Sequence, residues 1–246
     1  LRLNNRDHRK ILVVDGKVAF TGGINLADEY INKKVRFGHW KDSAIMVRGE
    51  AAWSMTVMFL TLWDYTREIF TEDYDVFRPK WERPPKGVGY VQPYTDNPLD
   101  GEAVGQSVYL NLINKARRYV YITTPYLIVD DSMNTALCIA AKSGVDVRIM
   151  TPHIPDKKVV FEVTRAHYDA LLEAGVKIYE YTPGFVHAKN FAVDDKYGTV
   201  GTVNMDYRSL FLHFEDGVWL CGDPTVRDIK ADFLATLEYC QPITLE

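Results

Sequence analysis

Two short segments of the sequence carry the same reactive side chains: a histidine, a lysine two positions later and an asparagine further along. These residues are His8, Lys10 and Asn25 in the first segment and His187, Lys189 and Asn204 in the second. Two imidazoles suit phosphodiester exchange without a metal, because one can attack phosphorus while the other protonates the departing alkoxide. Histidine fits both roles since its usual pKa is about 6.5. Lysine and asparagine side chains can hold the non-bridging oxygens and offset the charge that develops on them.

Both segments keep the pattern HxKxxxxD in a common register. Asp15 closes the first copy and Asp194 closes the second, and matched positions are separated by 179 residues. The same offset pairs Gly22 with Gly201. We infer an internal duplication in which each copy presents one histidine and one lysine.

Two downstream carboxylates are candidates for orienting the histidines. A reacting imidazole needs an acceptor at its other ring nitrogen, which fixes the tautomer and stabilises the imidazolium. Asp42 lies downstream of the first motif in HWKDS, and Glu215 lies downstream of the second in HFED. We expect these two residues to orient the histidines, although their spacing from the motifs differs.

Each motif is expected to form a β-hairpin. Residues 11–14 are a β-rich run, Asp15-Gly16 is a strong turn signal, and residues 18–21 would form the return strand. The second copy has the same pattern around Asp194-Asp195. On the first strand of each hairpin, histidine and lysine stand two residues apart and therefore share one face.

The segment between the copies alternates between strand and helix patterns. We expect helices over residues 107–118, 131–143 and 156–174, the last capped by Asp156, and strands over residues 119–124, 145–150 and 176–181. This alternation predicts an α/β fold of two pseudo-symmetric α-β-α sandwich repeats with largely parallel sheets.

The repeats divide the chain unequally. Residues 1–87 would be the C-terminal part of the first repeat, residues 88–105 the linker, and residues 106–246 the second repeat. Several elements precede the second motif, whereas seven residues precede the first. We therefore expect the first repeat to be truncated at its N-terminus by roughly 80 to 100 residues, the length of such a set of elements.

The motifs and their surroundings resemble the catalytic repeats of cardiolipin synthases in the phospholipase D superfamily. The first repeat carries HRKILVVD, TGGINLADEY and HWKDS, and the second carries TPGFVHAKNFAVDD and VGTVNMDYRSLFLHFE. The resemblance implies that the paired His, Lys and Asn residues form the active site, with His8 as nucleophile and His187 as acid. It also implies that the motif aspartates lie outside the reaction centre and support the motif structurally. This chain departs from the family at Thr202, where serine is frequent, and at His213, where asparagine is usual.

The same resemblance implies a membrane-associated phosphatidyltransferase that makes cardiolipin and glycerol from two phosphatidylglycerol molecules. Its partners would be the phospholipid substrate and a membrane surface. No cofactor or metal is expected, because the sequence offers no carboxylate or Cys/His cluster at ligand spacing. Weaker candidates for lining the substrate site are Tyr126, His153, Phe185 and Thr202.

Two alternatives remain open at this stage. The first is a phospholipase D-type phosphodiesterase or nuclease that uses water as acceptor, and the second is an inactive lipid-binding module. A net charge of −4 argues against a basic nucleic-acid-binding surface, so no nucleic acid partner is expected. We expect the protein at the cell membrane with its catalytic domain on the cytoplasmic face. The anchor would lie outside this chain, because the most apolar run, residues 51–63, is far shorter than the ~20 residues that span a bilayer.

Overall fold

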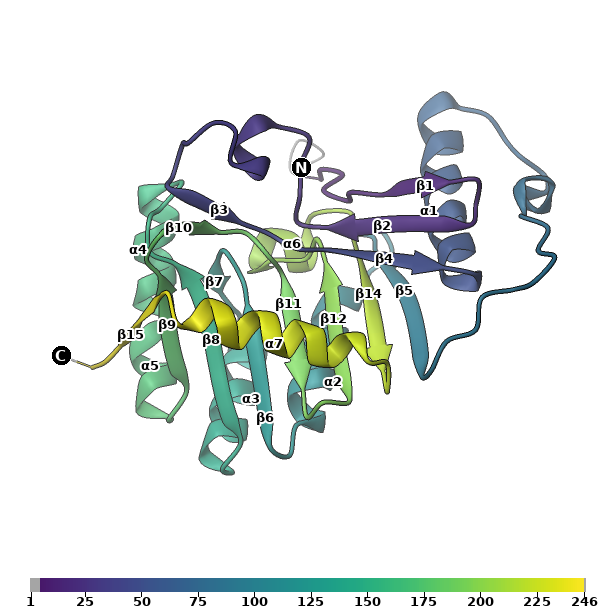
Figure 1. Cartoon of the computed structure of the whole chain (residues 1–246). Coiled ribbons are helices and arrows are strands. Elements are labelled where there is room, and N and C mark those ends of the chain that lie inside the picture. The colour runs from purple at the N-terminus through teal and green to yellow at the C-terminus, as the bar shows by residue number, and fades with distance from the viewer. Residues whose placement is uncertain (1–4, 246) are drawn as a thin grey trace.

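The computed structural model describes residues 5–245 and is built around one large mixed sheet (Figure 1). Its strands, in spatial order, are β15 (Cys240–Ile243), β9 (Lys177–Tyr181), β8 (Asp146–Pro152), β6 (Tyr119–Thr123), β11 (Asn190–Val193), β12 (Tyr197–Gly201), β14 (Glu215–Cys221) and β5 (Tyr90–Asp96). Strands β6, β8 and β9 are parallel, and the other pairs are antiparallel.

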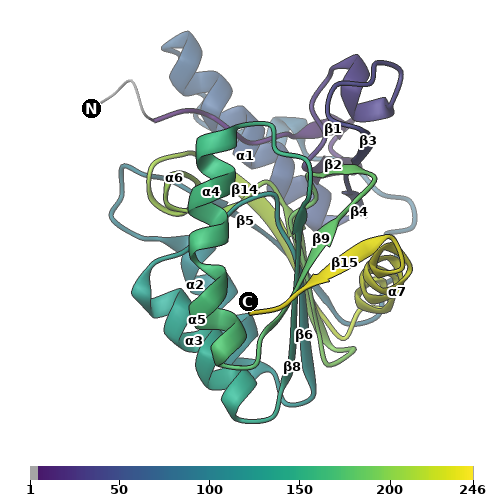
Figure 2. The same ribbon diagram turned by 90° about the vertical axis from the view of Figure 1, so that its left-hand side faces the viewer.

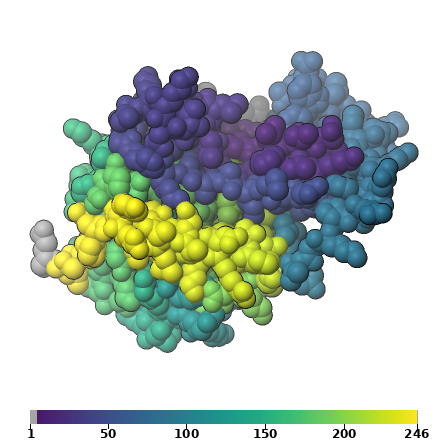
Figure 3. Space-filling model, in the orientation of Figure 1, coloured from purple at the N-terminus to yellow at the C-terminus, as the bar shows by residue number. Residues whose placement is uncertain are grey.

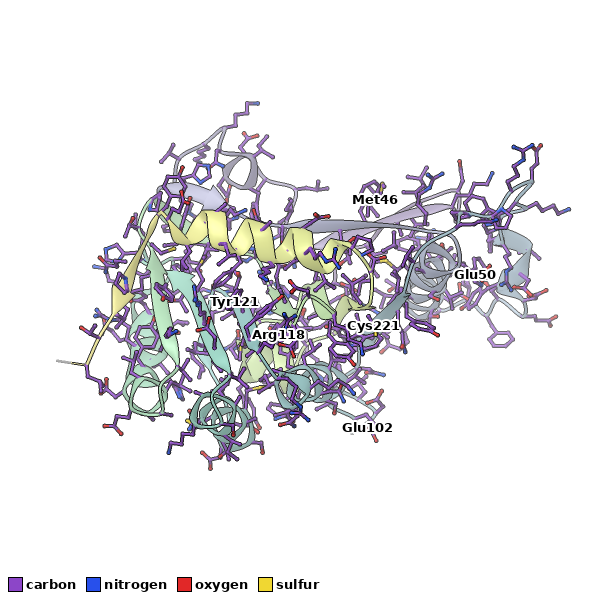
Figure 4. All side chains as sticks on the ribbon, turned by 60° about the horizontal axis from the view of Figure 1, so that its bottom comes forward. Met46, Glu50, Glu102, Arg118, Tyr121 and Cys221 are labelled. Atoms are coloured by element: carbon purple, nitrogen blue, oxygen red, sulfur yellow. The ribbon has the colours of Figure 1, made fainter. Side chains whose placement is uncertain are left out.

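Helices cover both faces of this sheet, as Figure 2 shows edge-on. One face carries α2 (Val104–Lys115), α3 (Asp131–Lys142), α4 (Lys158–Ala166) and α5 (Tyr168–Glu173), and the other carries α7 (Thr225–Leu237). The first face packs a core that includes Leu112 of α2 and Leu137 of α3. On the second face, Tyr121 lies beneath α7 (Figure 4) and stacks on Phe233 with ring centroids 5.0 Å apart.

The first repeat lies across the same face as α7. Its elements are β1 (Leu12–Val14), β2 (Val18–Gly22), the 3₁₀ helix η2 (Asp28–Ile31), β3 (His39–Lys41), β4 (Ala44–Arg48), α1 (Glu50–Arg67) and the 3₁₀ helix η3 (Tyr74–Phe77). Strands β1, β2 and β4 form a separate antiparallel sheet. Figure 3 shows this segment, in purple and blue, seated against the green and yellow second repeat. The buried side chains of Ile45 and Val47 share a core with Val200 and Val218.

The duplicated hairpins have the same local geometry. Asp15 and Gly16 both have positive φ, 53° and 64°, and Asp194 and Asp195 repeat it with 55° and 58°. Two consecutive left-handed residues make the tight turn whose twist matches that of the flanking strands. The predicted hairpins are therefore confirmed, and β2 and β12 keep the 179-residue offset at both ends.

The predicted α/β sandwich is confirmed, with three differences in detail. Within the large sheet, parallel pairing is limited to β6, β8 and β9, and the other neighbouring strands, including the hairpin strands β11 and β12, pair antiparallel. The stretch 88–105, expected as a linker, contains β5, which pairs with β14 at the sheet edge. The helix expected over residues 156–174 is divided at His167, and Asp156 does not cap it, because α4 begins two residues later with Lys157 as its N-cap.

Four short elements complete the second repeat. Strands β7 (Leu127–Ile128) and β13 (Met205–Asp206) pair in parallel, β10 (Gly184–Val186) pairs with β3, and α6 (Tyr207–Phe211) follows β13. Asp206 caps α6 by accepting a hydrogen bond from the Ser209 amide at 2.9 Å. No helix within residues 5–245 is long and apolar enough to cross a membrane.

Candidate active site

The backbone before His187 pairs with the first repeat. Strand β10 runs parallel to β3, with Val186 opposite Lys41. The His187 amide donates to the Lys41 carbonyl at 2.7 Å. The next residue along the chain from Lys41 is Asp42, so this pairing delivers a first-repeat carboxylate to the second-repeat histidine.

The backbone before His8 makes the reciprocal pairing. Asp7 forms a parallel bridge with Phe214, and the His8 amide donates to the Phe214 carbonyl at 2.9 Å. Glu215 follows Phe214, so a second-repeat carboxylate reaches the first-repeat histidine. Each repeat thus supplies a carboxylate to the histidine of the other.

The side chains complete this exchange. His187 Nδ1 lies 2.9 Å from Asp42 Oδ2, and His8 Nδ1 lies 2.8 Å from Glu215 Oε2. Both carboxylates are almost completely buried, at 2% and 0% side-chain exposure. An ionised carboxylate can only accept, so each Nδ1 carries the hydrogen and each Nε2 is left for chemistry. The sequence identified both acids, but their crossed assignment arises from strand pairing between distant segments.

Both histidines line one cavity of about 800 Å³. Among the predicted residues, Asn25, Asn204, Tyr126 and Phe185 line it as well. Its remaining lining mixes cationic with apolar and aromatic side chains: Arg6, Lys157, Arg208, Tyr30, Trp40, Ile128, Val160, Tyr207 and Leu212, with the acidic Asp7, Asp156 and Asp206 and the imidazole of His213. Such a lining suits a ligand with an anionic centre and apolar parts.

Comparison with known proteins agrees with this geometry. Residues 109–237 match a family model described as cardiolipin synthase, phospholipase D-like domain. A cardiolipin synthase of Alkalihalophilus pseudofirmus is 40% identical over 241 residues, covering 98% of this chain and 48% of the relative. The chain belongs to the cardiolipin synthase family of phospholipase D-like proteins.

A more similar relative has no described activity. An uncharacterised protein of Streptococcus mutans is 54% identical over 244 residues, covering 98% of this chain and 52% of that protein. The chain therefore spans about half the length of the curated relatives it matches.

Solved structures confirm the fold. The phosphatidylserine synthase of Haemophilus influenzae matches 96% of this chain and 63% of its own, with a TM-score of 0.69 and 15% identity. The phospholipase D family member Nuc of Salmonella typhimurium matches 63% of this chain and 99% of its own, with a TM-score of 0.53 and 18% identity. At these identities the likeness concerns the fold alone.

Burial controls the protonation of this cardiolipin synthase-family site. Desolvation, reinforced by the charge of Lys189, lowers the pKa of His187 to about 4, so its imidazole is neutral at pH 7. Burial would raise the pKa of Glu215, but the neighbouring imidazoles of His213 and His8 hold it at about 2. Burial likewise opposes the ionisation of Asp42, but the hydrogen bond from His187, the charge of Lys189 and the Ser43 amide together lower that pKa. Both orienting acids are therefore anionic.

The motif lysines lie beneath the histidines that precede them. Lys10 Nζ donates to the His8 carbonyl at 2.6 Å, and Lys189 Nζ donates to the His187 carbonyl. Desolvation lowers the pKa of both ammonium groups, that of Lys189 to about 7. An anionic phosphate in the cavity would favour the charged form of both.

The two asparagines have different surroundings. Asn25 Nδ2 donates to the Tyr30 hydroxyl at 2.5 Å. The amide oxygen of Asn204 is buried with no hydrogen-bond partner among the described residues. Because buried polar atoms normally have partners, this free amide oxygen at the cavity wall is a candidate ligand contact.

Two sequence candidates for the substrate lining lie elsewhere. Thr202 is completely buried, and its hydroxyl donates to Glu215 Oε2, so it supports the acid rather than the substrate. His153 is outside the cavity lining, and its Nδ1 lies 2.8 Å from Glu180 Oε2. Its position directly after a strand predicted that His153 would line the cavity. Instead it pairs with the buried carboxylate of Glu180 on β9.

The motif aspartates lie on the hairpin turns, at the far end of the hairpins from the histidines. Asp194 accepts hydrogen bonds from the backbone amides of Arg117, Arg118 and Tyr119 at 2.7, 2.9 and 2.9 Å, which ties its hairpin to the loop between α2 and β6. Asp15 makes no side-chain hydrogen bond within residues 5–245. The structural role implied for these aspartates fits Asp194 and stays a prediction for Asp15.

Sequence reasoning missed three residues around the histidines. Tyr30 and Trp40 lie against the His187 ring, with centroids 5.5 and 5.2 Å away. His213 lies 5.7 Å from His8 between ring centroids, and its Nδ1 is 3.6 Å from Glu215 Oε1. The only signal for His213 was its departure from the family pattern. It also corrects the expectation that ligand-spaced clusters are missing, because donor atoms of His8, His213 and Glu215 lie within 4.8 Å of one another.

Proposed function

We propose that this chain is the catalytic part of a membrane-associated phosphatidyltransferase that makes cardiolipin and glycerol from two phosphatidylglycerol molecules. The observation that carries the proposal is the pair of histidines on one cavity, each held at Nδ1 by a buried carboxylate from the other repeat. Membership of the cardiolipin synthase family supports the choice of a phospholipid as substrate.

The proposed reaction has two displacements at phosphorus. In the first, Nε2 of one histidine attacks the phosphodiester and forms a P–N bond, while the P–O bond to glycerol breaks. The other histidine gives its Nε2 proton to the departing glycerol oxygen. In the second, this histidine takes the proton from a hydroxyl of the second phosphatidylglycerol, whose oxygen attacks phosphorus as the P–N bond breaks. The asparagines line the cavity and can contact the phosphoryl oxygens, while the lysines, which donate to the histidine carbonyls, add positive charge behind them.

The assignment of the two histidines follows the resemblance, which favours His8 as nucleophile and His187 as acid. The low pKa of His187 in the free protein favours the reverse, because a neutral imidazole suits attack. A bound phosphodiester anion would raise that pKa and allow the acid role. We expect a radiolabelled intermediate, quenched in alkali because a P–N bond is labile in acid, to carry the label on the peptide containing His8. Label on the His187 peptide would exchange the two roles within the same reaction.

The side chains of the segment between β2 and β3 support the proposal that the protein acts at a membrane surface. Asn25 and Tyr30 of this segment line the cavity. Leu26, Ile31 and Val35 of the same segment are exposed to solvent. Three cations, Lys33, Lys34 and Arg36, lie beside these apolar residues in the sequence. Apolar side chains next to cations at the edge of a site favour contact with an anionic lipid surface.

Lipid product analysis tests the proposal. The intact protein that contains this chain is incubated with phosphatidylglycerol vesicles labelled in the headgroup glycerol and, separately, in the acyl chains. We expect labelled glycerol and cardiolipin in equal amounts. His8→Ala and His187→Ala should each lower turnover by at least ~10³-fold, and both variants should unfold at nearly the temperature of the unsubstituted protein. Phosphatidic acid as the main product would indicate hydrolysis instead. Retained activity in either variant would exclude the paired mechanism.

A further inference from the structure

The second imidazole beside Glu215 is unused by the reaction proposed above. His213 is only 12% exposed at its side chain, and neither ring nitrogen has a hydrogen-bond partner among the described residues. A buried imidazole without partners is costly and requires an explanation. Its Nδ1 points at Glu215, 3.6 Å from Oε1.

The three neighbouring donors have the types and spacing of a transition-metal site. Each of His8, His213 and Glu215 offers a donor atom within 4.8 Å of the other two, and His8 Nδ1 is 3.0 Å from Oε1 and 2.8 Å from Oε2. Zinc binds imidazole nitrogen and carboxylate oxygen at about 2.0 to 2.2 Å, which places tetrahedral donors roughly 3.3 Å apart. Small side-chain rotations would bring the present donors to that spacing. Thr202, which donates to Oε2, already holds the carboxylate in place.

We propose that His8, His213 and Glu215 form an inhibitory site for zinc or a similar divalent transition metal. His8 and His213 both line the cavity, so the ion can enter from it and keeps its fourth position open towards it. Binding replaces the His8–Glu215 hydrogen bond with two metal bonds, and the proton that leaves His8 Nδ1 is taken up at Nε2 through solvent.

The inhibitory consequence follows from imidazole chemistry and rests on the proposed function. A neutral imidazole that binds a metal through Nδ1 carries its one hydrogen on Nε2. That nitrogen then has no lone pair for attack on phosphorus or for accepting a proton from the incoming alcohol. Turnover therefore stops whichever role His8 has. The metal site itself does not depend on the reaction.

Metal binding is measured first, without lipid. The intact protein is stripped with chelator and titrated with Co²⁺, whose visible absorption reports four-coordinate nitrogen and oxygen ligation, and then with Zn²⁺ in competition. His213→Asn removes one ligand, and His153→Asn is the matched control because it removes an imidazole beside another buried glutamate, Glu180. We expect binding to weaken by at least about tenfold in His213→Asn and to be unchanged in His153→Asn.

The outcomes separate the site from its consequence. Equal Co²⁺ affinity in His213→Asn and the unsubstituted protein would overturn the site, as would equal losses in both variants. Thermal unfolding checks each fold, and His213→Gln replaces His213→Asn if the latter is unstable. In the lipid assay, each protein's zinc inhibition is expressed relative to its own metal-free rate. A site that binds zinc without inhibiting turnover would overturn the inhibitory role and leave the binding result standing.

Discussion

At the scale of single residues, the site depends on how closely Asp42 approaches its neighbours. A Cβ on Gly23 would lie 2.1 Å from Asp42 Oδ1 and 2.7 Å from the His187 carbonyl oxygen. Such distances are impossible without displacing the acid or the backbone that carries the histidine. Gly23 therefore positions the Asp42–His187 pair, although it touches no substrate.

We expect Gly23→Ala to lower kcat by about 100-fold, because a displacement near 1 Å in a reacting group has this effect. Gly87→Ala is the matched control, since a Cβ there meets no atom within 4 Å. Steady-state lipid transfer and thermal unfolding of both variants give the comparison. Equal kcat values for the two variants would show that Asp42 tolerates the added methyl group.

The burial of His187 predicts a pH-dependent stability. Its pKa is about 4 when folded and 6.5 in a free chain, so the unfolded state binds more protons between these values. The neutral, buried His187 therefore contributes its full share of the free energy of unfolding above pH 6.5. This contribution decreases as the pH falls towards 4, by on the order of 3 kcal/mol. Denaturant titrations at pH 7 and pH 4.5 should show this decrease, and His187→Asn should flatten it. An identical decrease in His187→Asn would assign it to other groups.

At the scale of elements, the segment between β2 and β3 forms one wall of the cavity and carries exposed apolar residues. We expect Leu26→Ser combined with Val35→Ser to weaken binding to phosphatidylglycerol vesicles by about tenfold or more, because each buried aliphatic side chain contributes about 1.5 to 3 kcal/mol. Ile139→Ser on α3 is the control, since this residue is exposed on a distant helix. Vesicle co-sedimentation gives the affinities.

Hydrolysis of a soluble phosphodiester completes that comparison. Cleavage of the soluble compound should continue in the doubly substituted protein, because its histidines and carboxylates are unchanged. If vesicle binding is unaffected, another surface contacts the lipid.

The elements could be predicted where local chemistry decides them. The hairpins follow from Asp15-Gly16 and its copy, and the strands β6, β8 and β9 follow from apolar runs between helix signals. Strand β5 was not predicted, because Pro93 and the neighbouring glycines are typical of a linker. An edge strand tolerates proline, and pairing with β14 keeps this segment extended despite the local signal. The bridge between Asp7 and Phe214 joins residues 207 positions apart, and no local pattern reports such a contact.

At the scale of the whole molecule, neither repeat contains a complete site. Residues 88–246 alone would keep His187 but lose Asp42, and they would expose the sheet face around Val200 and Val218 that the first repeat covers. We expect this segment to unfold at a lower temperature by itself and to show no transfer activity. Co-expression with residues 1–87 should restore part of the stability. A separate segment as stable as the whole chain would contradict the shared core.

The exchange of carboxylates also has a consequence for how the two halves of the sequence evolve. A single repeat completes its site only by meeting a second copy, since each acid is hydrogen-bonded to the histidine of the other repeat. In one chain the two acids need not be identical, and here they differ: aspartate lies beside Gly23 and glutamate beside Thr202. A substitution near the acid in one half of the sequence therefore affects the histidine in the other half. Among related sequences, we expect the identity of each acid to vary together with the residue at position 23 or 202, and aligned homologues would reveal whether it does.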